Sequence, residues 1–125
     1  MKEALLSIIK DENRIITGQI DPQYLSDNLG RKKGTAEAVV FPVSTEEVSG
    51  VMRYAWENNL PVTPRGAGTN LVGSTVPSGQ GIVLDVSLMN HVLELDEETF
   101  TATVEPGVVL EDFQAYVESK GLFYP

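Results

Sequence analysis

The residues best suited to chemistry lie in one glycine-rich loop at positions 64–74, directly after a predicted strand. Gly66, Gly68 and Gly73 allow positive backbone angles and let a ligand approach the main chain closely. Successive amides in such a loop can converge into an anion-binding nest, and short polar side chains add donors. The pattern therefore indicates a pyrophosphate cradle built mostly from backbone N–H groups, although a tight turn without a ligand would show the same glycines.

The loop differs from both of the commonest nucleotide-binding motifs. It lacks the Gly-Lys-Ser/Thr ending of a P-loop, which argues against a nucleotide triphosphatase. It also lacks the G-x-G-x-x-G pattern that runs directly into a helix in Rossmann folds, because the residues after Gly68 remain loop-like. Arg65 adds a cation suited to phosphate. These residues thus indicate an anion site without naming the ligand.

The residues before the loop predict a strand–helix–strand unit. A β-rich run at 38–41 ends at Pro42, and the string Ser-Thr-Glu-Glu at 44–47 is typical of a helix start. Apolar residues three and four apart then give this helix one apolar stripe, before a strand begins at residue 60. Such units favour a parallel pair of strands with the helix covering one face.

The elements after the loop are predicted in this order: strands at 81–86, 91–96 and 100–104, and an amphipathic helix at 109–120. A turn at 96–99 joins the last two strands, and Gly121 ends the helix. Residues 1–34 are expected to form a helical lead-in, and residues 35–125 the main domain. The expected fold class is α+β, with a small, partly parallel sheet and helices packed on one side.

Composition and charge exclude several classes of protein. The 125-residue chain is 42% hydrophobic, has a formal charge of −9 and contains no cysteine. Its charge has the wrong sign for nucleic acid or an anionic membrane, and the missing thiols exclude disulfides and cysteine nucleophiles. No run approaches the ~18 apolar residues of a membrane span, and no signal peptide is evident, so a cytoplasmic protein is expected. The single histidine, His91, suits a surface position better than a metal site or catalysis.

The loop and its flanks together resemble a known family. The strings Phe-Pro-Val-Ser-Thr-Glu-Glu-Val at 41–48, Pro-Arg-Gly-Ala-Gly-Thr-Asn at 64–70 and Pro-Gly at 106–107 carry the likeness. In order and spacing they resemble the FAD-binding domain of the vanillyl-alcohol oxidase/p-cresol methylhydroxylase (PCMH) flavoproteins, and within it the glycolate oxidase large subunit and D-lactate dehydrogenases. The resemblance covers residues 36–125. It implies the N-terminal part of a PCMH-type domain within a longer protein.

The resemblance assigns FAD contacts to individual residues. The implied cofactor-binding residues are Pro42, Val43, Pro64, Arg65, Gly66, Ala67, Gly68, Thr69, Asn70, Gly73, Ser74, Pro106 and Gly107. The loop would wrap the pyrophosphate, Pro42 and Val43 would lie beside the adenosine half, and the Pro-Gly turn would lie near the flavin. Thr69 stands where covalently flavinylated members have histidine, so the FAD is expected to be held non-covalently. No catalytic residue and no metal ligand is expected in this chain.

The activity that the resemblance implies is oxidation of a small 2-hydroxy acid such as glycolate or D-lactate, with hydride transfer to the flavin. The substrate-binding domain would lie beyond Pro125. The resemblance also allows an iron–sulfur subunit as a partner of the longer parent protein. Apolar surface meant for that missing part predicts that this chain self-associates on its own. Two alternatives stay open: an NADPH-dependent reductase of the UDP-N-acetylenolpyruvoylglucosamine type, and a non-catalytic interaction module on the same fold.

Overall fold

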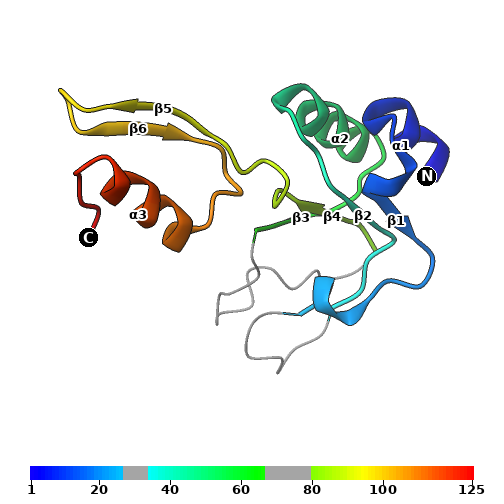
Figure 1. Ribbon diagram of the computed structural model, residues 1–125. Coiled ribbons are helices and arrows are strands. Elements are labelled where there is room, and N and C mark those ends of the chain that lie inside the picture. Colours follow the sequence, from blue (N-terminus) through cyan, green and yellow to red (C-terminus); the bar gives the residue numbers. More distant parts are fainter. Residues whose placement is uncertain (27–33, 67–79) are drawn as a thin grey trace.

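A computed structural model of the chain describes residues 1–26, 34–66 and 80–125, which form two units (Figure 1). The elements in chain order are α1 (Lys2–Ile9), the 3₁₀ turn η1 (Glu12–Arg14), β1 (Ile15–Thr17), the 3₁₀ turn η2 (Pro22–Tyr24), β2 (Ala38–Val40), α2 (Thr45–Glu57), β3 (Val62–Arg65), β4 (Ile82–Asp85), β5 (Val92–Asp96), β6 (Thr101–Val104) and α3 (Leu110–Ser119). The first unit runs from α1 to β4, and the second from β5 to α3.

The sheet of the first unit has the strand order β1-β2-β4-β3. β4 runs parallel to both β2 and β3, whereas β1 pairs antiparallel with β2. The predicted β2–α2–β3 unit is therefore parallel, but β4 is inserted between its two strands. Proline explains this order, because Pro64 in β3 has no N–H for a second neighbour and is tolerated at a sheet edge. All four residues of β4 are buried, which suits the centre of the sheet.

β1 is the element that the sequence pattern does not predict. It has three residues, too few to show an alternation, and its register pairs Ile15 with Val40 and Thr17 with Ala38. Asp21 accepts a hydrogen bond from the Gln23 amide at 3.0 Å and starts η2 as predicted. The N-terminal residues thus supply an edge strand as well as helix to the first unit.

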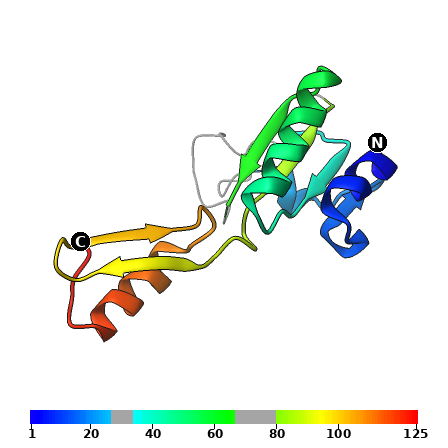
Figure 2. The ribbon, with the colours of Figure 1, turned by 90° about the horizontal axis from the view of Figure 1, so that it is seen from above.

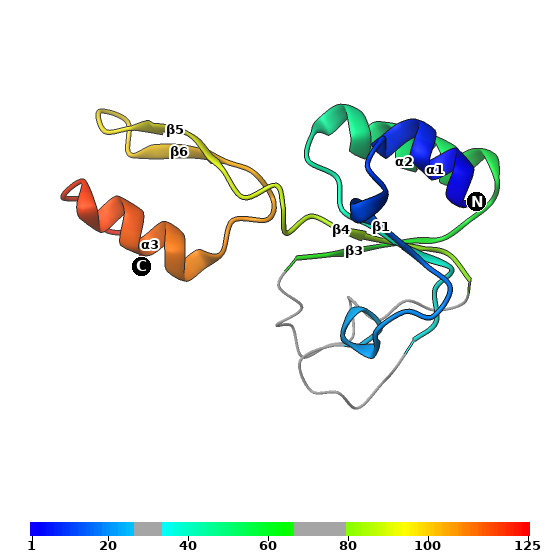
Figure 3. The ribbon, with the colours of Figure 1, turned by 45° about the vertical axis from the view of Figure 1, so that its right-hand side comes forward.

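The main core lies between the sheet and the helices α1 and α2, which cover the same face (Figures 1 and 3). Its buried members are Leu5, Ile9, Ile15, Ala38, Val40, Val51, Ala55, Ile82 and Leu84. Alternate residues of the two central strands, Val39 and Val83, face the opposite side and pack with Ile20. Helices on one side of a partly parallel sheet confirm the predicted fold class, with α1 rather than α3 as the second helix on that face.

The helix α2 begins and ends where the sequence predicts. The Glu47 amide donates to the Ser44 hydroxyl at 3.2 Å, and Asn59 has a left-handed φ of 54° just after the last turn. The apolar stripe is narrower than predicted, because Trp56 is 85% exposed while its neighbour Ala55 is buried. One residue further along a helix turns the side chain by about 100°, which takes Trp56 off the buried face.

The second unit is the β5–β6 hairpin with α3 beside it (Figure 2). The turn is the predicted one, since the Asp96 carboxylate accepts hydrogen bonds from the amides of Glu98 and Thr99. A cavity of about 600 Å³ opens between the hairpin and α3, lined mainly by apolar side chains. Phe123 is 76% exposed beside this cavity. Among the residues described, no helix has the length and apolar character needed to cross a membrane.

Candidate cofactor site

The carboxyl ends of the three parallel strands meet at one edge of the sheet. β2 continues into Pro42 and Val43, and Arg65 at the end of β3 is in register with Asp85 at the end of β4. Open sheets of this kind bind ligands in the crevice outside the carboxyl ends of the strands. The fold therefore brings the described loop residues and the Pro-Val segment to the edge where such a ligand would lie.

Arg65 and Gly66 lead out of β3 into the glycine-rich loop. The Arg65 carbonyl accepts a hydrogen bond from the Val86 amide at 2.8 Å, and its guanidinium Nη1 donates to the Ser26 carbonyl at 2.7 Å. A Cβ placed on Gly66 would meet no atom of the described residues within 4 Å, so the main chain there is open to a ligand on their side. An open main chain beside a fixed guanidinium has the donor chemistry that a diphosphate requires.

The remaining predicted loop residues cannot be placed against this edge. Ala67, Gly68, Thr69, Asn70, Gly73 and Ser74 lie outside the described residues. Pro64 lies within β3 and is exposed. Of the predicted pyrophosphate loop, the structure therefore describes only the entrance at positions 64–66.

The predicted Pro106–Gly107 turn lies near the end of β4, where the second unit meets the sheet. The Gly107 amide donates to the Met89 carbonyl at 2.8 Å, and a Cβ on Gly107 would lie 2.0 Å from the Val86 carbonyl oxygen. Any larger residue would displace the segment that connects β4 to β5. The Gly107 amide is already bonded within the chain, so it does not donate to a cofactor in this arrangement.

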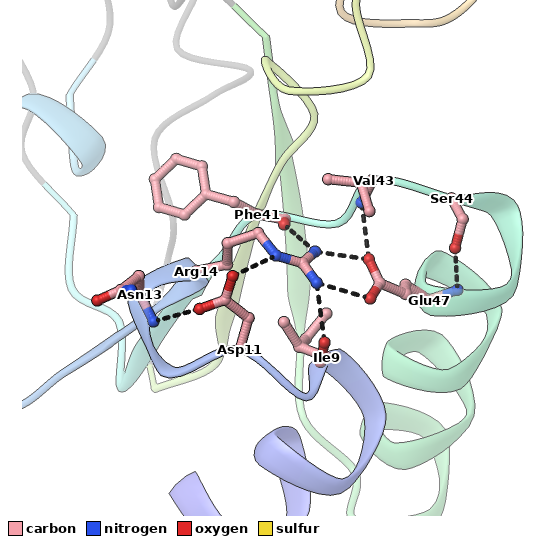
Figure 4. A network of polar contacts seen from close by, with 8 residues as sticks. All are labelled: Ile9, Asp11, Asn13, Arg14, Phe41, Val43, Ser44 and Glu47. Carbon is pink, nitrogen blue, oxygen red and sulfur yellow. Dashed lines mark hydrogen bonds and ion pairs between the residues drawn. The ribbon is translucent and has the colours of Figure 1, made fainter.

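A partly buried ion pair behind the Pro42–Val43 segment is a feature that the sequence does not reveal (Figure 4). Arg14 Nη1 and Nη2 bond to Glu47 Oε1 and Oε2 at 2.7 and 2.9 Å, and both side chains are about 15% exposed. The guanidinium also donates to the carbonyls of Ile9 and Phe41 at 2.8 and 3.0 Å. Glu47 stands out in the sequence only as part of the helix start, and Arg14 lies 33 residues away with no local signal.

Both partners of this pair titrate away from their ordinary ranges. The hydrogen bond from Arg14 holds the pKa of the Glu47 carboxyl below its ordinary value, although burial opposes that shift. The hydrogen bond to Glu47 raises the pKa of Arg14 in turn. The pair therefore stays ionised at neutral pH, and Asp11 Oδ2, 3.5 Å from Arg14 Nε, adds a second carboxylate to the cluster.

The pair fixes the main chain of the segment at both ends. Arg14 binds the Phe41 carbonyl, and Glu47 Oε1 accepts the Val43 amide at 2.8 Å. Pro42 is buried and has no amide hydrogen, while the Val43 side chain is 46% exposed. The segment can therefore offer a cofactor a fixed apolar surface, but no backbone N–H.

His91 lies at the surface, as its sequence context predicts. Its side chain is 73% exposed and bonds through Nδ1 to the Glu105 carboxylate, which holds the pKa of Glu105 below its ordinary value. Within residues 1–26, 34–66 and 80–125, no three His, Asp or Glu side chains gather closely enough to hold a metal ion.

Comparison with known families now defines the class of the protein. The sequence profile of a family described as an FAD binding domain matches residues 36–125, so the chain belongs to that family. Its cofactor is FAD, and the resemblance found in the loop strings is confirmed.

Curated relatives include several oxidases and dehydrogenases named for hydroxy acids. The chain is 42% identical over 125 residues to glycolate oxidase subunit GlcD of Bacillus subtilis, matching 100% of this chain and 27% of that protein. It is 38% identical over 114 residues to D-lactate dehydrogenase of Anaerostipes hadrus, matching 90% of this chain and 24% of that protein. The chain thus spans about a quarter of the length of these relatives.

Solved structures support the same fold. A p-cresol methylhydroxylase with bound substrate superposes with a TM-score of 0.81 at 23% identity, covering 97% of this chain and 24% of that one. A 4-ethylphenol oxidase from Gulosibacter chungangensis gives a TM-score of 0.83 at 26% identity, covering 96% of this chain and 24% of that one. The architecture described above is therefore that of part of a PCMH-type FAD-binding domain.

Proposed function

We propose that this chain holds FAD for an oxidase or dehydrogenase of small 2-hydroxy acids, at the carboxyl edge of β2, β4 and β3. The observation that carries the site is the convergence of Val43, Arg65 and the open main chain of Gly66 at that edge. The substrate class is supported by the names of relatives, since glycolate, D-lactate and D-2-hydroxyglutarate are all 2-hydroxy acids. Bound FAD would supply the hydride acceptor for that oxidation.

The chain's own residues bind and orient the cofactor in this proposal. Arg65 offsets diphosphate charge, Gly66 admits it to the main chain, and Val43 packs against the adenosine half. The Pro106–Gly107 turn is proposed to lie near the flavin, with the Gly107 amide already bonded to the Met89 carbonyl. The remaining contacts come from Ala67, Gly68, Thr69, Asn70, Gly73 and Ser74, as the family resemblance implies.

Non-covalent attachment follows from Thr69, which offers no imidazole for a flavin bond. Acid precipitation of the flavin-loaded protein should leave all of the yellow colour in the supernatant. Flavin that stays with the pellet would contradict this part of the proposal.

Further features of the whole protein are proposed on the same basis. We place it in the cytoplasm, divide this chain into a lead-in at 1–34 and a cofactor domain at 35–125, and assign substrate binding and catalysis to residues outside it. An iron–sulfur subunit is a candidate partner for the longer protein. Expressed alone, this chain should self-associate through the apolar lining between α3 and the hairpin, where Leu110, Phe100 and Phe123 are exposed.

Flavin titration of the full gene product tests the proposal. A protein that purifies colourless and does not quench added FAD fluorescence would contradict it and favour an interaction module. If FAD binds, turnover of glycolate and of D-lactate with an artificial acceptor decides the substrate. Oxidation of NADPH without turnover of either acid would favour the enolpyruvyl-reductase alternative.

A further inference from the structure

We infer that Arg14 is a positioning residue for the FAD site, acting through Glu47 on the Pro42–Val43 segment. This inference rests on the proposed function of the sheet edge. Arg14 lies outside residues 36–125, the part that the family profile matches, so the profile assigns it no role. Its side chain nevertheless reaches the loop that follows β2.

The contacts of Arg14 join three segments of the chain (Figure 4). Its guanidinium binds the end of α1 through the Ile9 carbonyl, the end of β2 through the Phe41 carbonyl, and α2 through the Glu47 carboxylate. Its own carbonyl accepts the Phe41 amide at 2.9 Å. Planar, two-pronged pairing of this kind fixes orientation as well as distance, which a lysine ammonium cannot do.

Glu47 carries the effect of Arg14 to the site. One carboxylate oxygen accepts both the Arg14 guanidinium and the Val43 amide, at 2.7 and 2.8 Å. Without Arg14, the carboxylate would lose its orientation and release the Val43 amide. It would also become an uncompensated negative charge behind a site for an anionic diphosphate, which opposes FAD binding through its field.

A fluorescence titration of apo full-length protein with FAD tests the inference. Arg14→Gln should raise the Kd for FAD about tenfold or more, the scale of one lost charged hydrogen bond. Arg14→Lys keeps the positive charge but cannot form the two-pronged pairing with Glu47, so it should give an intermediate Kd. Adding Glu47→Gln to Arg14→Gln removes the uncompensated charge and should recover part of the affinity.

Two controls separate positioning from general destabilisation. Ile82→Val removes a methyl group from the buried core at the amino end of β4, opposite the carboxyl edge, so it should lower the melting temperature of the apo protein without changing the Kd. Lys2→Gln deletes a cation from an exposed ion pair with Glu12 and should change neither. Hydrogen exchange of a peptide covering residues 41–48 should speed up in Arg14→Gln but not in either control.

The outcomes are distinguishable. An Arg14→Gln protein that binds FAD within twofold of wild type overturns the inference and leaves the proposed function intact. If that variant does not fold, an unchanged Kd for Arg14→Lys overturns it instead. A wild-type protein that does not bind FAD overturns both.

Discussion

Gly107 and Gly66 provide a matched pair of glycine substitutions with opposite expected effects. A methyl group on Gly107 would lie 2.0 Å from the Val86 carbonyl oxygen and 2.8 Å from that of Met89. Both neighbours are main-chain atoms, so no side-chain rotation relieves the overlap. Among the described residues, a methyl group on Gly66 would meet no atom within 4 Å, although Gly66 lies at the proposed cofactor edge.

The expected cost of Gly107→Ala follows from these contacts. Forcing an extra methyl group into a packed site costs about 1–3 kcal/mol. The shift also strains the 2.8 Å bond from the Gly107 amide to the Met89 carbonyl, a contribution of about 1 kcal/mol. We therefore expect Gly107→Ala to lose about 2–4 kcal/mol of folding free energy, whereas Gly66→Ala stays within about 0.5 kcal/mol.

Urea unfolding of the apo protein and FAD titration together check the pair. Gly107→Ala should unfold at a lower urea concentration than wild type. Its affinity for FAD should fall only to the extent that the substitution displaces the second unit from the sheet. Gly66→Ala should unfold like wild type and yet bind FAD more weakly, because its methyl group fills space that the ligand uses. A Gly107→Ala protein as stable as wild type would refute the packing role, and undiminished FAD affinity in Gly66→Ala would refute the open entrance to the cradle.

Three further predictions concern the first unit. Leu5→Ala should lower the free energy of unfolding by about 2–5 kcal/mol, because Leu5 is fully buried. The control Leu93→Ala, at a residue of β5 that is 64% exposed, should lower it by less than about 0.5 kcal/mol, and chemical unfolding measures both values. Ser44→Ala removes the N-terminal cap of α2 and should lower the free energy of unfolding by about 1 kcal/mol. In the same assay, Ser49→Ala at an exposed position inside the helix should change it very little. Because the folded-state pKa of Glu47 is lowered, its stabilisation is complete above the ordinary glutamate pKa of about 4.3 and is lost as pH falls through the folded value. Acid titration of Glu47→Gln, followed by circular dichroism, should therefore show a shallower loss of stability below that pH than wild type, and equal slopes would contradict this linkage.

Local signals predict those parts of the fold that depend on residues close in sequence. The start of α2 at Ser44, its end at Asn59 and the turn at Asp96 are each settled by hydrogen bonds within a few residues, and all three are confirmed. The family likeness is of the same kind, because its strings are short and contiguous.

Only the tertiary structure decides which distant surfaces meet. The insertion of β4 between β2 and β3, and the pairing of Arg14 with Glu47, depend on contacts between segments that carry no mutual signal in sequence. The same holds for Gly107. Its sequence context indicates only a turn, and the structure shows that the Val86 carbonyl oxygen leaves no room for a Cβ there. The sequence by itself determined the helices, the turns and the FAD class. Packing decided which residues stand behind the cofactor edge, because burial and charge pairing are settled only when the segments come together.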